Sequence, residues 1–359
     1  MKNKNHKSKI VLSLILFVII VGCISGSNRT NLRKQPKFVA VSSRDNKAAY
    51  SYDGIKWTAV SIPSMSWWHS LQKLETKLLG IPANSIVWSS VTYGNGKFVA
   101  IASRNYSPFS SGGGGSLYAP DTAAYSYDGI EWEVTEMSGG SSVTYGNNKF
   151  VTGSTHSTDG IKWFQTGFVG WTSACYGNGR FVAITVGGAG GQGRNNDPLY
   201  PVFDSDLRII YSNDGIERIN TTAPINDNWS RVCYGNGKFV AVSYDKAAYS
   251  TDGIKWKMTT IPVKAHWQGI CYGKDKFVAI NDSINDWNKR AIYSEDGINW
   301  KTATMPGNES WSSICYGNDK FVVISTYSNK AAYSYDGINW SKTTMPDETE
   351  WSSVCYGGD

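Results

Sequence analysis

Cysteine, histidine and charge of one sign are all scarce in this sequence, and each scarcity excludes a class of protein. The 359 residues include six Cys and four His, and no Cys-x-x-Cys or Cys/His spacing typical of a metal site occurs. No block of like charges is present, and 35 basic against 29 acidic residues give a net charge of +6. We therefore expect no cofactor, no metal and no nucleic-acid partner.

Long apolar runs are also nearly absent. The exception, residues 10–21, follows a basic start and precedes Gly22-Cys23. This run is too short to span a membrane comfortably, and its layout is that of a secretory signal. The segment Ile20-Val21-Gly22-Cys23 resembles the bacterial lipobox, in which the cysteine becomes the lipidated first residue of the mature protein.

The lipobox resemblance implies a signal peptide over residues 1–22 and an exported lipoprotein of the bacterial cell envelope, held on a lipid bilayer through Cys23. A plain signal peptide or an uncleaved anchor helix are the alternatives. Residues 23–36 then form the lipid-anchored linker, which is polar after the cysteine. Loss of four leader lysines would leave 31 basic against 29 acidic residues, a balance too weak to attract nucleic acid.

An Asp-Gly turn recurs along the rest of the chain. In the copy at 330–340, Lys-Ala-Ala-Tyr-Ser-Tyr-Asp-Gly-Ile-Asn-Trp, the turn lies between two short apolar stretches. Such a pattern predicts a hairpin, because Gly accepts a positive φ and Asp bonds to the turn backbone. The seven turns contain Gly54, Gly129, Gly160, Gly215, Gly253, Gly297 and Gly337.

Each full repeat predicts four short strands, which we name A to D. Four strands in 40 to 50 residues are typical of a β-propeller blade. The first repeat begins at Lys37 without strand A, and residues 351–359 supply strand A alone. We therefore predict an all-β fold over 37–359: a seven-bladed β-propeller of four-stranded antiparallel blades, its ring closed by the C-terminal strand.

The Ser-x-Asp-Gly-x-x-Trp turn resembles the Asp-box, or bacterial neuraminidase repeat, of sialidase-like β-propellers, with one residue fewer between Asp and Gly. The resemblance covers nearly all of 37–359. It implies that the box aspartates are structural and lie on the face away from a ligand. These are Asp53, Asp128, Asp159, Asp214, Asp252, Asp296 and Asp336. The third repeat is shortened, and the fourth has lost its Trp, so these two blades depart most from the pattern.

Three insertions, 61–87, 104–122 and 185–208, interrupt the repeat in D–A or B–C connections. These connections share one face of a propeller, opposite the Asp-Gly turns, and long loops on a rigid scaffold commonly bind ligands. The first insertion predicts a helix from Ser66 to Gly80, either a packed lid or a partner-binding helix. The candidate ligand face comprises Trp67, Arg104, Tyr106, Tyr118, His156, Arg194, Tyr200 and Arg208.

Recurring cysteines and tryptophans have structural explanations. Five Cys precede Tyr-Gly in strand A, too far apart between blades for disulfides, and we expect small buried wedges. A Trp heads strand A in six repeats, where it either packs between blades or stacks on sugars. Acidic residues of the third insertion, Asp197, Asp204 and Asp206, are either solvated or bind calcium.

Three functions remain open at this point. Sialidases clamp their substrate with three arginines, and the Phe-Arg-Ile-Pro motif that carries the first of them is absent. We therefore expect a non-catalytic, monomeric binding protein that recognises a protein or glycan. A sialidase-like glycoside hydrolase and an assembly factor for a membrane protein complex are the alternatives.

Overall fold

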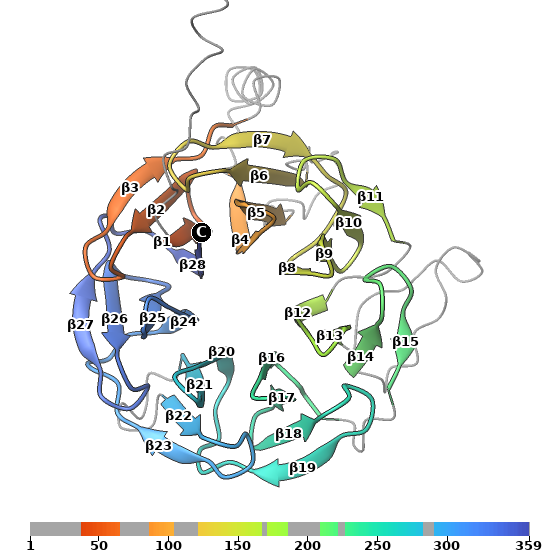
Figure 1. The fold of residues 1–359 in the computed structure, drawn as a ribbon. Coiled ribbons are helices and arrows are strands. Elements are labelled where there is room, and N and C mark those ends of the chain that lie inside the picture. Colours follow the sequence, from red (N-terminus) through yellow and green to blue (C-terminus); the bar gives the residue numbers. More distant parts are fainter. Residues whose placement is uncertain are drawn as a thin grey trace, which may run out of the picture. The chain divides into compact units, whose positions relative to one another are not determined.

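The computed structural model describes residues 37–64, 86–103, 121–166, 171–185, 209–221, 227–282 and 291–358. All regular elements in these ranges are strands, and they form seven four-stranded antiparallel sheets arranged as a ring (Figure 1). The predicted seven-bladed propeller is confirmed. Within these ranges no helix has the length and apolar character needed to cross a bilayer.

The blades follow one another along the chain, and their strands run from the ring axis outward as A, B, C and D (Figure 1). Blade 1 contains β28 (Trp351–Gly357), β1 (Lys37–Ser42), β2 (Lys47–Ser51) and β3 (Thr58–Ser61). Blade 2 contains β4 (Val87–Gly94), β5 (Lys97–Ser103), β6 (Thr122–Ser126) and β7 (Glu133–Glu136). Blade 3 contains β8 (Val143–Gly146), β9 (Lys149–Thr152), β10 (Thr155–Ser157) and β11 (Phe164–Gln165). Blade 4 contains β12 (Trp171–Gly177), β13 (Arg180–Thr185), β14 (Ile209–Ser212) and β15 (Ile219–Asn220).

The remaining three blades keep the regular pattern. Blade 5 contains β16 (Arg231–Gly235), β17 (Lys238–Val242), β18 (Lys246–Ser250) and β19 (Lys257–Thr260). Blade 6 contains β20 (Trp267–Gly273), β21 (Lys276–Asn281), β22 (Ala291–Ser294) and β23 (Lys301–Ala303). Blade 7 contains β24 (Trp311–Gly317), β25 (Lys320–Ser325), β26 (Lys330–Ser334) and β27 (Ser341–Thr344).

The C-terminal strand closes the ring, as predicted. β28 pairs antiparallel with β1, with Lys37 opposite Gly357 at one end and Ser42 opposite Trp351 at the other. Residues from the two ends of the chain thereby build one complete blade, and in Figure 1 β28 lies directly beside β1. The closure leaves no blade at an open end of the ring, so each inner strand packs against a neighbouring blade on both sides.

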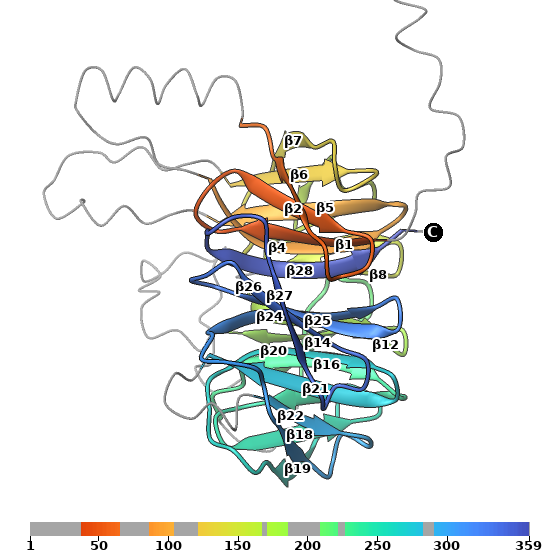
Figure 2. The same ribbon diagram turned by 90° about the vertical axis from the view of Figure 1, so that its left-hand side faces the viewer.

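The strand register defines two faces of the propeller. We call the end that carries the A–B turns and the seven Asp-Gly turns the turn face, and the opposite end the insertion face. Lys37 and Gly357 lie at the turn face, and the C-terminal end of β28 is seen there in the edge-on view of Figure 2. The Trp that heads strand A in six of the blades lies at the insertion end, as Trp351 and Trp311 show.

Side chains between neighbouring blades make the core. The A-strand tryptophans are buried, with Trp88, Trp311 and Trp351 fully inaccessible, which confirms that they pack between blades. Met345 and Trp351 join Val322 of β25 to Phe38 of β1 in a cluster that spans blades 7 and 1. Each blade therefore stabilises the next by removing apolar surface from water.

The five A-strand cysteines of the described chain are free thiols, as predicted from their spacing. Burial raises the pKa of each of them far above its ordinary value. No cluster of His, Cys, Asp and Glu suited to a metal ion occurs among the residues that the structure describes. The cysteines are thus packing residues between blades. They are Cys175, Cys233, Cys271, Cys315 and Cys355.

Candidate functional site

The Asp-Gly turns hold themselves together through one short network. In blade 7 the Ser334 hydroxyl donates to Asp336 Oδ1 at 2.9 Å and accepts from the Gly337 N–H at 2.8 Å. The same Oδ1 accepts the N–H groups of Ile338 and Asn339, both at 2.8 Å. All seven turns have these four bonds, including the turn of blade 4 that lacks the Trp.

This network keeps the turn carboxylates ionised. Burial raises the pKa of the Asp336 carboxyl, but hydrogen bonds from Asn339, Ile338 and Ser334 outweigh burial and bring the pKa to about 2. The pKa values of the other six box aspartates are lowered in the same way. The box aspartates therefore accept hydrogen bonds from their own turns, which fits the structural role that the Asp-box resemblance implies.

Basic side chains fasten five of the seven turns to the preceding blade. Lys320, at the start of β25, donates from Nζ to the carbonyl of Asp53 in blade 1 at 2.9 Å. The equivalent bonds run from Lys97 to Asp159 (2.7 Å), from Lys149 to Asp214 (3.1 Å), from Lys238 to Asp296 (3.1 Å) and from the Arg180 guanidinium to Asp252. The polar groups of the turn face thus hold neighbouring blades together.

The long connections begin and end at the insertion face. Insertion 61–87 joins β3 to β4, insertion 104–122 joins β5 to β6, and insertion 185–208 joins β13 to β14. Most of the candidate ligand residues belong to these connections and lie outside the described residues, as do the lipidation residue and the predicted helix. The residues that lie outside the described part of the chain are the lipidation residue Cys23 and seven candidate ligand residues: Trp67, Arg104, Tyr106, Tyr118, Arg194, Tyr200 and Arg208.

His156 is the candidate that the structure places, and it lies on β10 of the short third blade. It occupies the position that a tyrosine has in the other blades, and its ring is 5.8 Å from that of Phe164. Burial lowers its pKa, and Lys149 lowers it further. Lys149 binds the turn of Asp214, so the charged neighbours of His156 belong to the turn face. The expectation that His156 reaches the insertion face is not supported.

A partly buried polar network lies at the insertion end of blades 5 and 6. Arg231, near the start of strand A, donates from Nε to the Gln268 carbonyl at 2.6 Å and from Nη2 to Gln268 Oε1 at 3.1 Å. Gln268 in turn donates to Asp282 Oδ2 at 2.9 Å. In the other blades a small residue, usually Ser, stands where Arg231 does. The Gln268 side chain thereby links the Arg231 guanidinium to the Asp282 carboxylate.

Two exposed aromatic side chains also lie at the insertion face, in blades 5 and 7. Tyr244 and Tyr327, both in B–C connections, are 46% and 76% exposed. The ring of Tyr244 lies 5.4 Å from that of His266, and Lys264 pairs with Asp245 at 3.5 Å. Sequence reasoning missed these residues because it considered only the long insertions. Their position in B–C connections could have identified them, because these connections lie at the insertion face.

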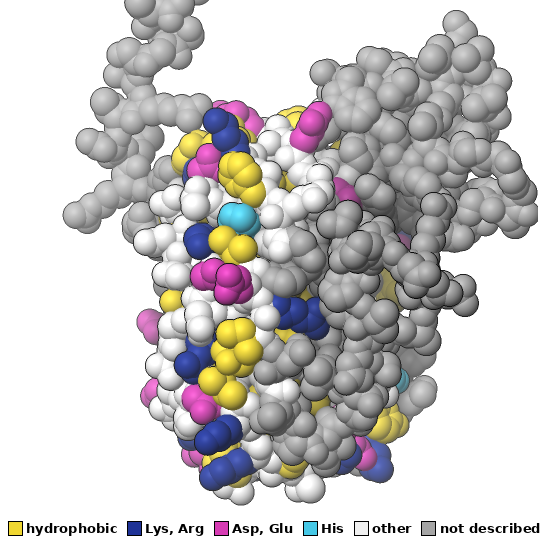
Figure 3. Space-filling model, turned by 90° about the vertical axis from the view of Figure 1, so that its right-hand side faces the viewer, with side chains coloured by type: hydrophobic (Ala, Val, Ile, Leu, Met, Phe, Trp, Pro, Cys, Tyr) yellow, Lys and Arg dark blue, Asp and Glu magenta, His cyan; other side chains and the backbone are white. Residues whose placement is uncertain are grey.

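The outer wall over β11 and β15 has a mixed surface. Figure 3 shows isolated apolar patches on this wall, separated by basic, acidic and polar side chains. Phe164 of β11 and Ile219 of β15 are exposed apolar residues on these two-residue outer strands. Such scattered exposure is ordinary for a protein surface and does not define a docking site.

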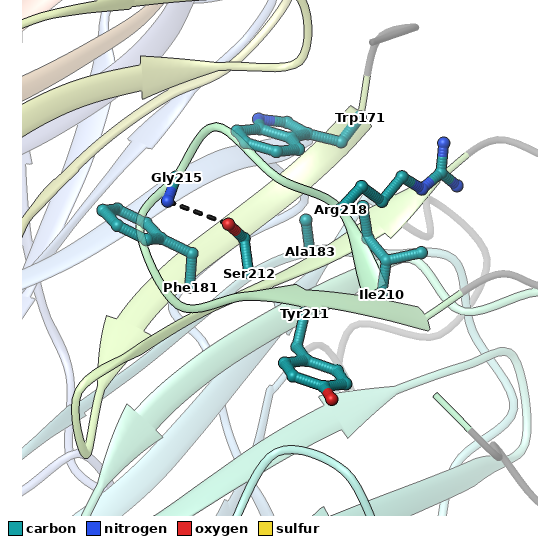
Figure 4. A pocket seen from close by; sticks show the side chains of 8 residues that line it. All are labelled: Trp171, Phe181, Ala183, Ile210, Tyr211, Ser212, Gly215 and Arg218. Atoms are coloured by element: carbon teal, nitrogen blue, oxygen red, sulfur yellow. Dashed lines mark hydrogen bonds between the residues drawn. The ribbon is translucent and has the colours of Figure 1, made fainter. Parts of the chain in front are cut away.

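One pocket opens where the fourth repeat departs from the pattern. Arg218 stands where the other six turns have Trp, and the pocket walls include Trp171, Phe181 and Ile210 (Figure 4). In blade 1 the corresponding space is filled by Trp57, packed against Phe38. The guanidinium points away from Phe181 and from Gly215 of the turn (Figure 4). Burial lowers the pKa of Arg218. The pocket therefore lies at the position where the other blades pack the box tryptophan.

Comparisons with known proteins are consistent with the fold. No family model and no curated protein sequence matches this chain. A solved structure of catalytically inactive virginiamycin B lyase from Staphylococcus aureus with quinupristin is similar at a TM-score of 0.56 and 12% identity, over 76% of this chain and 89% of that one. Apo AztD from Citrobacter koseri is similar at 0.51 and 10%, over 90% and 98%. At these identities the likenesses establish the fold alone.

Proposed function

We propose that this protein is an exported, lipid-anchored binding protein. Its propeller would be a monomeric recognition module for a protein or glycan, engaged at the insertion face, and Cys23 would hold it on the membrane. The observation that carries the proposal is the asymmetry of the two faces. At the turn face, polar groups form hydrogen bonds within and between blades. The three long connections, in contrast, all start and end at the insertion face.

The insertion face also offers suitable chemistry. Tyr244 and Tyr327 present exposed rings that can stack on sugars or pack against a protein. The Arg231, Gln268 and Asp282 network adds donors and an acceptor in a fixed arrangement. A rigid scaffold with such groups beside long connections supports binding without requiring a reaction.

The first test is binding of the full-length chain in detergent to a glycan array that includes sialosides. Retention on one sugar class supports a glycan ligand. An empty array together with a membrane complex that co-purifies in detergent supports a protein ligand and a role in assembly. Loss of terminal sialic acid from the array would contradict a non-catalytic module and favour the glycoside hydrolase.

A loop exchange then locates the site. Replacing residues 104–121 with the four-residue B–C connection 43–46 of blade 1 removes an insertion and keeps the strand pairing. We expect ligand binding to be lost or strongly weakened. The matched control exchanges Asn236-Gly237 for the Asn147-Asn148 turn of blade 3, at the turn face, and should bind as the parent does. Equal loss in both variants would contradict the assignment of the site.

A further inference from the structure

Three exposed tyrosines gather on one part of the turn face. Tyr335, Tyr52 and Tyr127 precede the box Asp in blades 7, 1 and 2 and are 57%, 47% and 37% exposed. The other four blades have no aromatic residue at this position. The residues there are Thr158, Asn213, Thr251 and Glu295. We call the three tyrosines the tyrosine arc.

Each ring of the arc is held in the same way. The Tyr52 ring packs edge-on against Tyr50 at 5.7 Å, and the Lys37 ammonium lies 4.8 Å from its centroid. Tyr127 has Tyr125 at 6.0 Å and Lys97 at 4.9 Å. Tyr335 has Tyr333 at 5.8 Å and Lys320 at 5.4 Å. Cation–π and edge-to-face contacts therefore fix the outward orientation of all three rings.

The arc is continuous across the three blades. Lys320, which lies beside the Tyr335 ring, donates to the Asp53 carbonyl next to Tyr52. Lys37, beside the Tyr52 ring, interacts electrostatically with Asp128, next to Tyr127. The three lysines are only 4 to 6% exposed, so the cations that hold the rings add little to the surface that the arc presents.

The chain enters the propeller at the centre of this arc. Lys37 begins β1 at the turn face of blade 1, between the blades that carry Tyr335 and Tyr127. The 13 residues 24–36 join this point to Cys23, and even fully extended they span at most about 45 Å. A lipid on Cys23 would therefore keep the tyrosine arc close to the bilayer.

We propose that the tyrosine arc rests on the lipid bilayer, with the three rings at the level of the headgroups. Tyrosine favours this zone because its ring is apolar and its hydroxyl is polar. The contact would orient the propeller so that the insertion face points away from the membrane. This inference rests on the lipid anchor of the proposed function. Because the lysines are covered, the contact should persist on neutral phosphatidylcholine and at high salt.

Hydroxyl-radical footprinting of the full-length lipidated protein tests the proposal. Oxidation of each tyrosine is compared between phosphatidylcholine vesicles and detergent, after flotation has confirmed attachment. We expect several-fold protection of the tyrosine arc and none of Tyr244 and Tyr327 at the insertion face. Flotation with no protection of the arc would overturn this inference and leave the anchor intact. Failure to float would contradict the anchor and this inference together.

A second measurement uses lysine acylation by a water-soluble reagent. Lys56, exposed in the blade 1 turn, should be protected on vesicles relative to Lys264 at the insertion face. Replacing all three arc tyrosines with Ser should restore Lys56 labelling. The matched control, Tyr244→Ser with Tyr327→Ser, should leave it protected. Continued protection of Lys56 in the triple variant would count against a role for the arc.

Discussion

At the level of single residues, Arg218 offers the clearest opportunity to improve packing. It occupies the position of the box tryptophan and leaves a pocket against Phe181 and Trp171. We expect Arg218→Trp to raise the free energy of unfolding by about 1–2 kcal/mol, because an indole would bury apolar surface there. Chemical denaturation would measure the change. Glu217→Trp adds the same ring at the neighbouring exposed position and should give no gain. A destabilised Arg218→Trp protein would show that contacts of Arg218 outweigh the missing packing.

The box aspartates predict a dependence of stability on acid. Asp336 has a folded pKa of about 2, below its ordinary value. The ionised Asp336 carboxylate therefore stabilises the folded protein above about pH 4, and this stabilisation is lost as the pH falls toward 2. Asp336→Asn keeps an acceptor oxygen but cannot ionise, so the stability difference from the parent protein should be largest at neutral pH and shrink toward pH 2. Urea unfolding at a series of pH values would measure it.

The control for this acid dependence is Glu348→Gln, at an exposed residue outside the boxes. Its stability difference from the parent protein should stay constant over the same pH range. A constant difference for Asp336→Asn as well would contradict the proposed role of the ionised carboxylate.

The local part of the site could be predicted from sequence, and the part between blades could not. The bonds of Asp336 reach only residues two or three positions away, so the Ser-x-Asp-Gly pattern contains them. The Arg231 network joins residues 37 positions apart, and only the placement of neighbouring blades brings Gln268 to it. The loss of the Trp at Arg218 was visible in the sequence, but the resulting pocket depends on the wall that Trp171 and Phe181 provide.

At the level of strands, the A strands pack through paired Gly and Tyr residues. A Cβ built on Gly317 would lie 2.0 Å from Cγ of Tyr356 in the next blade, and all seven blades have this contact. We expect Gly317→Ala to destabilise the protein by about 2–3 kcal/mol, because strand β24 and the ring of Tyr356 cannot both keep their places. Thermal and chemical unfolding would measure the loss.

Two variants separate this steric effect from a general intolerance of glycine substitution. Adding Tyr356→Ala to Gly317→Ala should cost less than the sum of the two single changes, since the ring is the obstacle. Gly237→Asn should stay within about 0.5 kcal/mol of the parent protein. Gly237 has open space around it, and Asn148 adopts a similar positive φ in the corresponding turn of blade 3. Simple additivity at Gly317 and Tyr356 would contradict the steric explanation.

Strand order was predictable, because every blade contains its own turn signals. The shortened third repeat and the decayed fourth repeat correspond to the two-residue outer strands β11 and β15. Strand length was harder to foresee, since it depends on pairing with β10 and β14 and not on the residues of the outer strands alone. The repeats therefore specify the number of blades more firmly than the extent of each blade.

At the level of the whole molecule, ring closure follows from the pairing of β28 with β1. Lys37 lies opposite Gly357, as Lys320 lies opposite Gly317 across the A–B turn of blade 7. Blade 1 thus has the same strand pairing as the other blades, but no A–B turn connects its strands β28 and β1. We predict that joining Gly357 to Lys37 through Asn-Gly, with new termini opened between Asn95 and Gly96, gives a folded propeller. The new termini would lie in the same turn of blade 2, at the turn face.

The permuted protein should keep the circular dichroism spectrum and unfold within a few degrees of the parent, because both have the same strand pairs and blade contacts. Removal of residues 351–358 should instead abolish cooperative unfolding. That truncation deletes strand A of blade 1 and exposes Phe38 and Val91 at the open joint, where Val91 also loses its bond to Ser353. A permuted protein that fails to fold, or a truncated one that unfolds as cooperatively as the parent, would contradict closure by β28 as the source of stability.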